Sequence, residues 1–123
     1  MTLYLYQFAY VPEALRAIVP GAAHAREIPF VFASWDYLGA AGRGLRPSAA
    51  DLAMTRTVHD CWVAFAKTGT PTCPDAPPWP AYSRATDTAM LFANDGARPA
   101  AGLDRARYDA QEATLLPVLG LRP

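Results

Sequence analysis

Residues 3–8 carry aromatic and aliphatic side chains on both alternating faces of a predicted strand. A strand that is apolar on both faces is typical of a parallel sheet that is covered on both sides. A parallel neighbour needs a crossover of about a dozen residues or more, usually a helix. Only two residues precede this strand, so we expect the chain to begin in the middle of a larger fold.

Residues 48–69 show the most regular helical pattern in the chain. Ser48 is a suitable N-cap with Asp51 three residues later, and Gly69 is a suitable C-terminal stop. Several residues recur at helical spacing between them, namely Leu52, Thr55, Val58, Trp62, Phe65 and Ala66. We expect Trp62, Phe65 and, further along, Trp79 to anchor the core.

Other segments give weaker signals. Residues 104–116 predict a second helix, and residues 89–92 predict a short edge strand before a turn at 94–96. The glycine-rich residues 39–44 are interpreted as a linker, because they do not lie between a strand and a helix as a phosphate-binding loop requires. Residues 27–32 are compatible with a helical turn or with an extended segment that Pro29 interrupts.

Composition bounds the class of protein. Of the 123 residues, 52% are apolar, which suffices for a core, and the formal net charge is zero with scattered basic residues. The sequence therefore predicts no nucleic-acid partner and no anionic membrane surface, and it favours a small uncharged substrate. No apolar run approaches the ~20 residues that span a bilayer. The sequence assigns no compartment and suggests no cofactor.

The two cysteines, Cys61 and Cys73, show neither C-x-x-C nor zinc-ligand spacing. They could pair if the loop between them folded back. We interpret Cys61 instead as a free buried thiol and Cys73 as an unpaired loop residue, with no catalytic or metal-binding role for either.

His24 is the strongest candidate for chemistry, because it follows the first strand on a turn rich in glycine and alanine. Small neighbours there would let a nucleophile approach a general base. The nucleophile is not recognisable, since Ser34, Ser48 and Ser83 all lack the G-x-S-x-G context. His59 has Val63 in place of a second ligand at i+4, so we interpret it as a surface or hydrogen-bonded core histidine.

Four motifs occur together in a recognisable order: GAAHAREIPFVF at residues 21–32, CWVAFAKTGTP at 61–71, WPAY at 79–82 and MLF at 90–92. In these motifs the chain resembles the C-terminal end of type-B carboxylesterases, the family of para-nitrobenzyl esterases and cholinesterases. The resemblance covers nearly the whole chain. It implies that residues 1–123 are the C-terminal segment of an α/β-hydrolase domain with an incomplete sheet.

The resemblance also implies roles for two residues. His24 corresponds to the triad histidine on the loop after the last core strand, whereas the family's serine and glutamate lie upstream and are absent from this chain. Glu27 corresponds to a glutamate near the site that is not the triad acid. A helix-terminal carboxylate that accepts hydrogen bonds from backbone N–H groups is the alternative interpretation of Glu27.

From the resemblance we expect a carboxylic-ester hydrolase segment that is inactive alone and that needs an upstream segment to act on a small ester. Self-association or docking to that missing N-terminal part would cover its open strand. The alternative is a non-catalytic interaction module of the same fold, because fold alone does not determine function.

Two positions depart from the family pattern. Ala25 and Ala33 stand where the family usually has glycine. If the backbone at these positions has positive φ, each alanine costs on the order of 1 kcal/mol or shifts the His24 loop.

Overall fold

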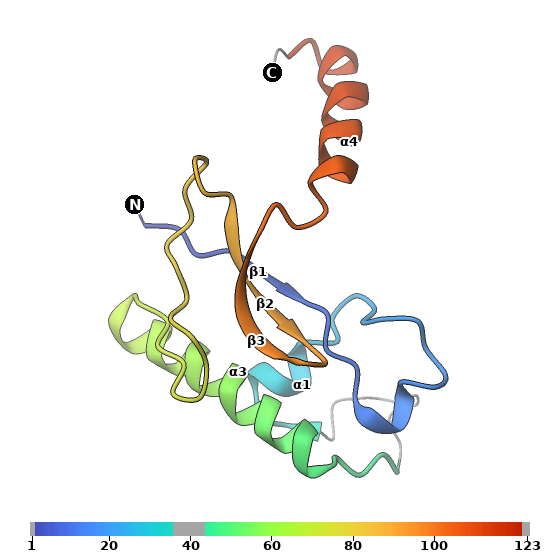
Figure 1. Ribbon diagram of the computed structural model, residues 1–123, viewed down its shortest axis with the longest axis vertical. Coiled ribbons are helices and arrows are strands. Elements are labelled where there is room, and N and C mark those ends of the chain that lie inside the picture. Colours follow the sequence, from blue (N-terminus) through green and yellow to red (C-terminus); the bar gives the residue numbers. More distant parts are fainter. Residues whose placement is uncertain (1, 36–43, 122–123) are drawn as a thin grey trace.

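The computed structural model describes residues 2–35 and 44–121, and its centre is one three-stranded sheet (Figure 1). The strands, in the order in which they neighbour one another, are β1 (Tyr6–Phe8), β2 (Thr88–Ala93) and β3 (Gly96–Ala101). The helices are the 3-10 helix η1 (Glu13–Leu15), α1 (Ile28–Val31), α3 (Ala49–Thr68) and α4 (Arg105–Val118). β1 runs parallel to β2, with Tyr6 opposite Met90, which confirms the parallel pairing expected from the first strand.

β1 is shorter and more exposed than predicted. Leu3 and Leu5 precede the strand and are 48% and 43% exposed, and Tyr6 is 42% exposed, so the prediction of burial on both faces is wrong for this chain. α1 and α3 lie together on one side of the sheet, whereas α4 extends away from it (Figure 1). A single covered side leaves the alternate side chains of the strand in contact with solvent.

β2 is the central strand of the sheet, and the prediction of an edge strand at residues 89–92 is wrong. The turn at 94–96 is instead part of a hairpin, in which β3 pairs antiparallel with β2 and Met90 lies opposite Pro99. β3 was not predicted, because a run of alanines with Arg98 and Pro99 carries no strand pattern. Proline cannot donate to a sheet ladder and is tolerated on an edge strand, which is where β3 places it.

α3 begins and ends where the sequence predicts. The Ser48 side chain accepts a hydrogen bond from the Asp51 backbone N–H at 3.1 Å, and the Asp51 carboxylate accepts one from the Ser48 N–H at 2.9 Å. Gly69 ends the helix with φ of 76°, a left-handed conformation that glycine adopts without steric cost. The capping box and the glycine stop are therefore confirmed.

The buried face of α3 differs in part from the predicted one. Leu52 and Phe65 are exposed, Trp62 is half-buried, and Thr55 and Val58 are buried as expected. Asp51 is buried where Leu52 was expected, and its carboxylate is hydrogen-bonded to Tyr10, Ser48 and Glu13. The core cluster consists of Tyr10, Phe30, Met54, Val58, Cys61, Cys73, Trp79, Met90 and Phe92.

The cysteine interpretation is wrong: Cys61 and Cys73 form a disulfide, with their Cα atoms 4.6 Å apart. Both are buried in the core cluster. The loop after α3 folds back onto the helix, and this reversal brings the two residues together although twelve positions separate them.

The remaining predictions have mixed outcomes. Residues 28–31 form the helical alternative, α1, with Pro29 in the first turn, where its missing N–H has no intrahelical partner to lose. α4 is present as predicted but buries none of its residues. The predicted linker at 39–44 lies outside the described residues except for Gly44.

Candidate active site

His24 lies in the turn of residues 24–27, between the loop that leaves β1 and the start of α1. Its side chain is exposed. The turn is closed by a hydrogen bond from the Arg26 N–H to the Ala23 carbonyl at 3.3 Å. Among the described residues no side chain is hydrogen-bonded to His24, so the imidazole is available to a group from elsewhere.

The backbone on either side of α1 has positive φ at two alanines. φ is 63° at Ala25, directly after His24, and 48° at Ala33, directly after the helix. The condition considered in the sequence analysis, positive φ at both positions, is therefore met. An L-residue with a Cβ pays roughly 1–2 kcal/mol there, so the turn that carries His24 is locally strained.

The loop before His24 is held at its start by two side chains from distant parts of the chain. The Val11 N–H donates to Asn94 Oδ1 at 2.7 Å. Asp51 Oδ1 accepts from the Tyr10 hydroxyl at 2.7 Å and from the Glu13 N–H at 3.1 Å. The end of β1 and the start of η1 are thus fixed to the N-terminus of α3.

Asp51 is almost fully buried and ionised in this arrangement. Burial alone would raise the pKa of its carboxyl, but hydrogen bonds from Ser48, Tyr10 and Glu13 outweigh burial and hold that pKa below its ordinary value. The pKa of the Tyr10 phenol is raised far above its ordinary value by burial and by the hydrogen bond to Asp51. Tyr10 is therefore a neutral donor to the Asp51 carboxylate.

α1, which follows His24, is held at its other end by α3. His59 Nδ1 lies 2.8 Å from the Val31 carbonyl oxygen, where a protonated Nδ1 donates to the last turn of α1. The Phe30 ring is 1% exposed and packs against Phe8 and Tyr10, with ring centroids 4.9 and 5.4 Å apart. His59 is thus a hydrogen-bonded histidine, as its spacing predicted, and the helix that follows the His24 turn is held against α3 and β1.

Beneath the loop lies a cavity of about 480 Å³. Its lining is mainly apolar and comes from the segment that connects β1 to α1, with Leu15, Val19, Ala22 and Phe30 among the walls and Arg26 at its side. A cavity of this size is comparable with small-molecule sites. The His24 turn therefore borders a mainly apolar cavity with a charged residue, Arg26, in its lining.

Glu27 immediately precedes α1, but its side chain makes no capping hydrogen bond to the helix. The alternative in which it satisfies backbone donors is thus not what the structure contains. The pKa of the Tyr6 phenol is raised by burial, and the negative charge of Glu27 adds to the shift. Glu27 is therefore close enough to β1 for its charge to affect the Tyr6 phenol.

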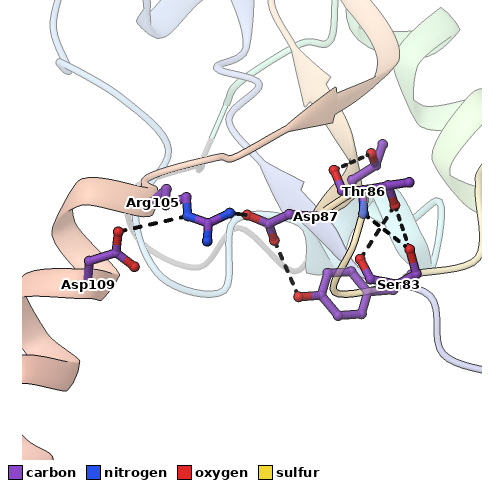
Figure 2. Close-up of polar contacts among 7 residues, drawn as sticks. Ser83, Thr86, Asp87, Arg105 and Asp109 are labelled. Carbon is purple, nitrogen blue, oxygen red and sulfur yellow. Dashed lines mark hydrogen bonds and ion pairs between the residues drawn. The ribbon is translucent and has the colours of Figure 1, made fainter. Parts of the chain in front are cut away.

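No hydrogen bond joins a serine to His24 within the described residues, and Ser48 and Ser83 have structural contacts of their own. Ser48 is the N-cap of α3. Ser83 lies in a polar cluster before β2, where its hydroxyl pairs with Thr86 Oγ1 at 2.9 Å (Figure 2). Asp87 in the same cluster accepts from Arg105 Nη1 at 3.2 Å, which attaches the first turn of α4 to the sheet. The polar cluster in Figure 2 therefore has a structural role, because it joins α4 to the residues before β2.

The described residues contain no group of three histidine, cysteine or acidic side chains that could hold a metal ion. Nor does any helix in residues 2–35 and 44–121 combine the length and the apolar character needed to cross a membrane.

Comparison with known proteins identifies the family. The profile of the carboxylesterase family matches residues 1–111. The chain belongs to the carboxylesterase family. It is 40% identical over 105 residues to phenmedipham hydrolase of Pseudarthrobacter oxydans and 30% identical over 95 residues to para-nitrobenzyl esterase of Bacillus subtilis. These alignments cover 81% and 73% of this chain.

Solved structures agree with the sequence matches. A carboxylesterase of Geobacillus stearothermophilus superposes with a TM-score of 0.65 at 29% identity, covering 85% of this chain and 21% of that one. A PNB esterase superposes with a TM-score of 0.68 at 27% identity, covering 88% of this chain and 21% of the esterase. This chain is therefore part of an α/β-hydrolase fold with an incomplete sheet. It spans about a fifth of the length of the relatives that it matches, 20% and 18% for the two hydrolases above.

Sequence reasoning missed the residues that support the His24 loop. Tyr10 and Asn94 were not singled out, and Asp51 was recognised only as a helix cap. The capping box explains the presence of Asp51 with residues of the helix terminus alone, so nothing in the sequence indicated that Tyr10 also binds it. Tyr10 lies 41 positions from Asp51, and Val11 lies 83 positions from Asn94, so neither contact left a local pattern in the sequence.

Proposed function

We propose that residues 1–123 form the C-terminal segment of a carboxylic-ester hydrolase domain in which His24 is the histidine of a Ser–Glu–His triad. The observation that carries the proposal is the exposed His24 in a strained turn. This turn lies between a loop whose start is bonded to Asp51 and Asn94 and the helix α1, which is bonded to His59. Such a turn leaves the imidazole open to a nucleophile from another segment.

In this proposal the serine and the acidic partner come from polypeptide that is not part of this chain. His24 would take the proton of the serine hydroxyl as the serine attacks the ester carbonyl, and would return it to the departing alcohol. The acid would fix the tautomer of the imidazole and stabilise the imidazolium. Glu27 would act from beside the site, through neighbouring groups, and not as the triad acid.

The substrate in this proposal is a small uncharged ester. The apolar cavity beside the His24 turn and the zero net charge of the chain support an apolar ligand over a charged one. The partner is the upstream part of the same fold, which would cover the half-exposed residues of β1. Until that part is present, the segment has a general base but no nucleophile and no oxyanion donors.

The first experiment incubates the purified chain with para-nitrophenyl acetate. We expect no turnover above buffer, because a general base without a nucleophile can activate only water. A rate that shows turnover and disappears in His24→Ala would contradict the proposal, whereas slow stoichiometric acylation of the imidazole is compatible with it.

The second experiment places residues 1–123 in a complete enzyme, in exchange for the corresponding segment of phenmedipham hydrolase. In an active graft, His24→Ala should lower kcat on the order of 10⁴-fold or more. His59→Ala is the matched histidine control: it removes a side chain that bonds the backbone of α1 but takes no part in proton transfer, so it should lower kcat far less than His24→Ala. If His59→Ala abolished turnover and His24→Ala did not, the assignment would be wrong. A graft whose activity survives both changes would favour the non-catalytic alternative for this segment.

A further inference from the structure

The segment that connects α3 to β2 is irregular and is attached to the core by a covalent bond. It contains five prolines between residues 71 and 80 and no helix or strand. Cys73 in this segment is bonded to Cys61 in α3, and the two residues are 6% and 0% exposed. The disulfide therefore holds this segment against α3, the helix that precedes it.

The attached segment also binds the residues that immediately precede β1. Trp79 Nε1 donates to the Leu5 carbonyl at 2.9 Å, and the Tyr82 N–H donates to the Leu3 carbonyl at 2.8 Å. The Trp79 ring also packs on Trp62, the neighbour of Cys61, with ring centroids 5.2 Å apart. The disulfide and the two tryptophans are therefore one unit between α3 and β1.

The chemistry of the two sulfurs indicates a structural bond and not a catalytic one. Reactive cysteines are partly exposed in electropositive surroundings, whereas these lie in the apolar core cluster with Met90 and Phe92. A reductant reaches a buried disulfide only after the surrounding structure opens. Disulfides of this kind persist in oxidising compartments and are rare where glutathione and thioredoxin keep thiols reduced.

We propose that Cys61–Cys73 is a structural disulfide that fixes the Trp79 segment on β1, and that the chain acquires it in an oxidising compartment from a protein disulfide oxidant. One cysteine thiolate attacks the oxidant's disulfide and forms a mixed disulfide, and the second thiolate displaces the oxidant's sulfur. The two cysteines lose two protons and two electrons, and the oxidant's disulfide becomes a dithiol. The proposal is independent of the catalytic role of His24.

A tryptic map without reductant tests the bond directly. Cleavage after Arg56, Lys67 and Arg84 places Cys61 in the peptide 57–67 and Cys73 in the peptide 68–84. The chain is produced in an oxidising compartment, and free thiols are alkylated before digestion. We expect one linked species with the summed mass of both peptides less two hydrogens, which separates on reduction. Two separate alkylated peptides would overturn the proposal.

Cysteine variants test the structural role. In Cys61→Ala and Cys73→Ala, native-state cleavage after Lys67 and Arg84 should become on the order of tenfold faster, because the cross-link no longer limits opening of the segment. Thr72→Ala, an exposed neighbour of Cys73, is the matched control and should be cut at the parental rate. Aggregation of both cysteine variants while Thr72→Ala folds would also support the role. Parental cleavage rates in folded cysteine variants would overturn it.

A third experiment tests whether the disulfide and the folded segment depend on an oxidising compartment. The chain produced in a reducing cytosol should give the two separate peptides and should be cut as fast as the cysteine variants. A reduced chain that is cut at the rate of the oxidised chain would show that the fold does not depend on an oxidising compartment and would refute that part of the proposal.

Discussion

Replacing Ala25 with glycine should stabilise the turn that carries His24. The φ of 63° at Ala25 brings its Cβ close to the following carbonyl oxygen, at roughly 1–2 kcal/mol. Glycine relieves this contact but loses about 0.5–1 kcal/mol more backbone entropy on folding. The difference leaves a net gain of about 0.5–1 kcal/mol, which corresponds to a roughly two- to fivefold smaller population of the open turn.

Native-state proteolysis measures this population without requiring cooperative unfolding of the whole chain. Arg26 follows Ala25, so trypsin cleavage after Arg26 requires the turn to open, and its rate follows the open population when opening is fast. Ala25→Gly should slow this cleavage two- to fivefold after division by the rate in an unfolded peptide of the same sequence.

Ala23→Gly is the matched control for this prediction, because Ala23 is exposed in the same loop but does not have positive φ. It should leave the rate unchanged or increase it. If both glycine variants changed the rate alike, strain at Ala25 would not be the cause, and the same reasoning for Ala33 would fail with it.

Three further predictions concern the support of the loop and the exposed surface. Asp51→Asn should destabilise the fold by about 1–3 kcal/mol in urea unfolding at the same protein concentration as the parent, because it removes charge-assisted hydrogen bonds from the buried Tyr10 hydroxyl and from the Glu13 N–H. The pKa of Asp51 is lowered in the folded state, so the stability that its ionised carboxylate contributes is complete above the ordinary aspartate pKa of about 3.9. This stability is lost as pH falls through the lower pKa of the folded state. Below about pH 4 the urea midpoint of the parent should therefore fall more steeply than that of Asp51→Asn. Ala33→Gly should raise the urea midpoint, whereas Ser34→Gly, beside it without positive φ, should not. The chain alone should elute as a self-associated species in size-exclusion chromatography, because Leu3, Leu5 and the apolar side chains of α4 are exposed; a monomer with a cooperative thermal transition would contradict this.

Much of the local structure follows from short stretches of sequence. Ser48, Asp51 and Gly69 determine where α3 begins and ends, because the groups that satisfy a helix terminus lie within four residues of it. The family resemblance identified Ala25 and Ala33 as positions where glycine is usual, and the structure shows that both have positive φ. The position of His24 between β1 and α1 follows in the same way, whereas its role in catalysis stays a prediction.

Only the tertiary structure decided which distant segments meet. Cys61 pairs with Cys73 because the proline-rich segment folds back, and no spacing rule distinguishes that outcome from two free thiols. β3 exists because β2 offers it a hydrogen-bonding edge, although alanine, Arg98 and Pro99 have little preference for a strand. The contact of Asp51 with Tyr10 joins residues 41 positions apart. Local sequence determines backbone preferences within a few residues, whereas burial and long-range hydrogen bonding depend on the whole chain, which is why the helix ends could be predicted and the support of the His24 turn could not.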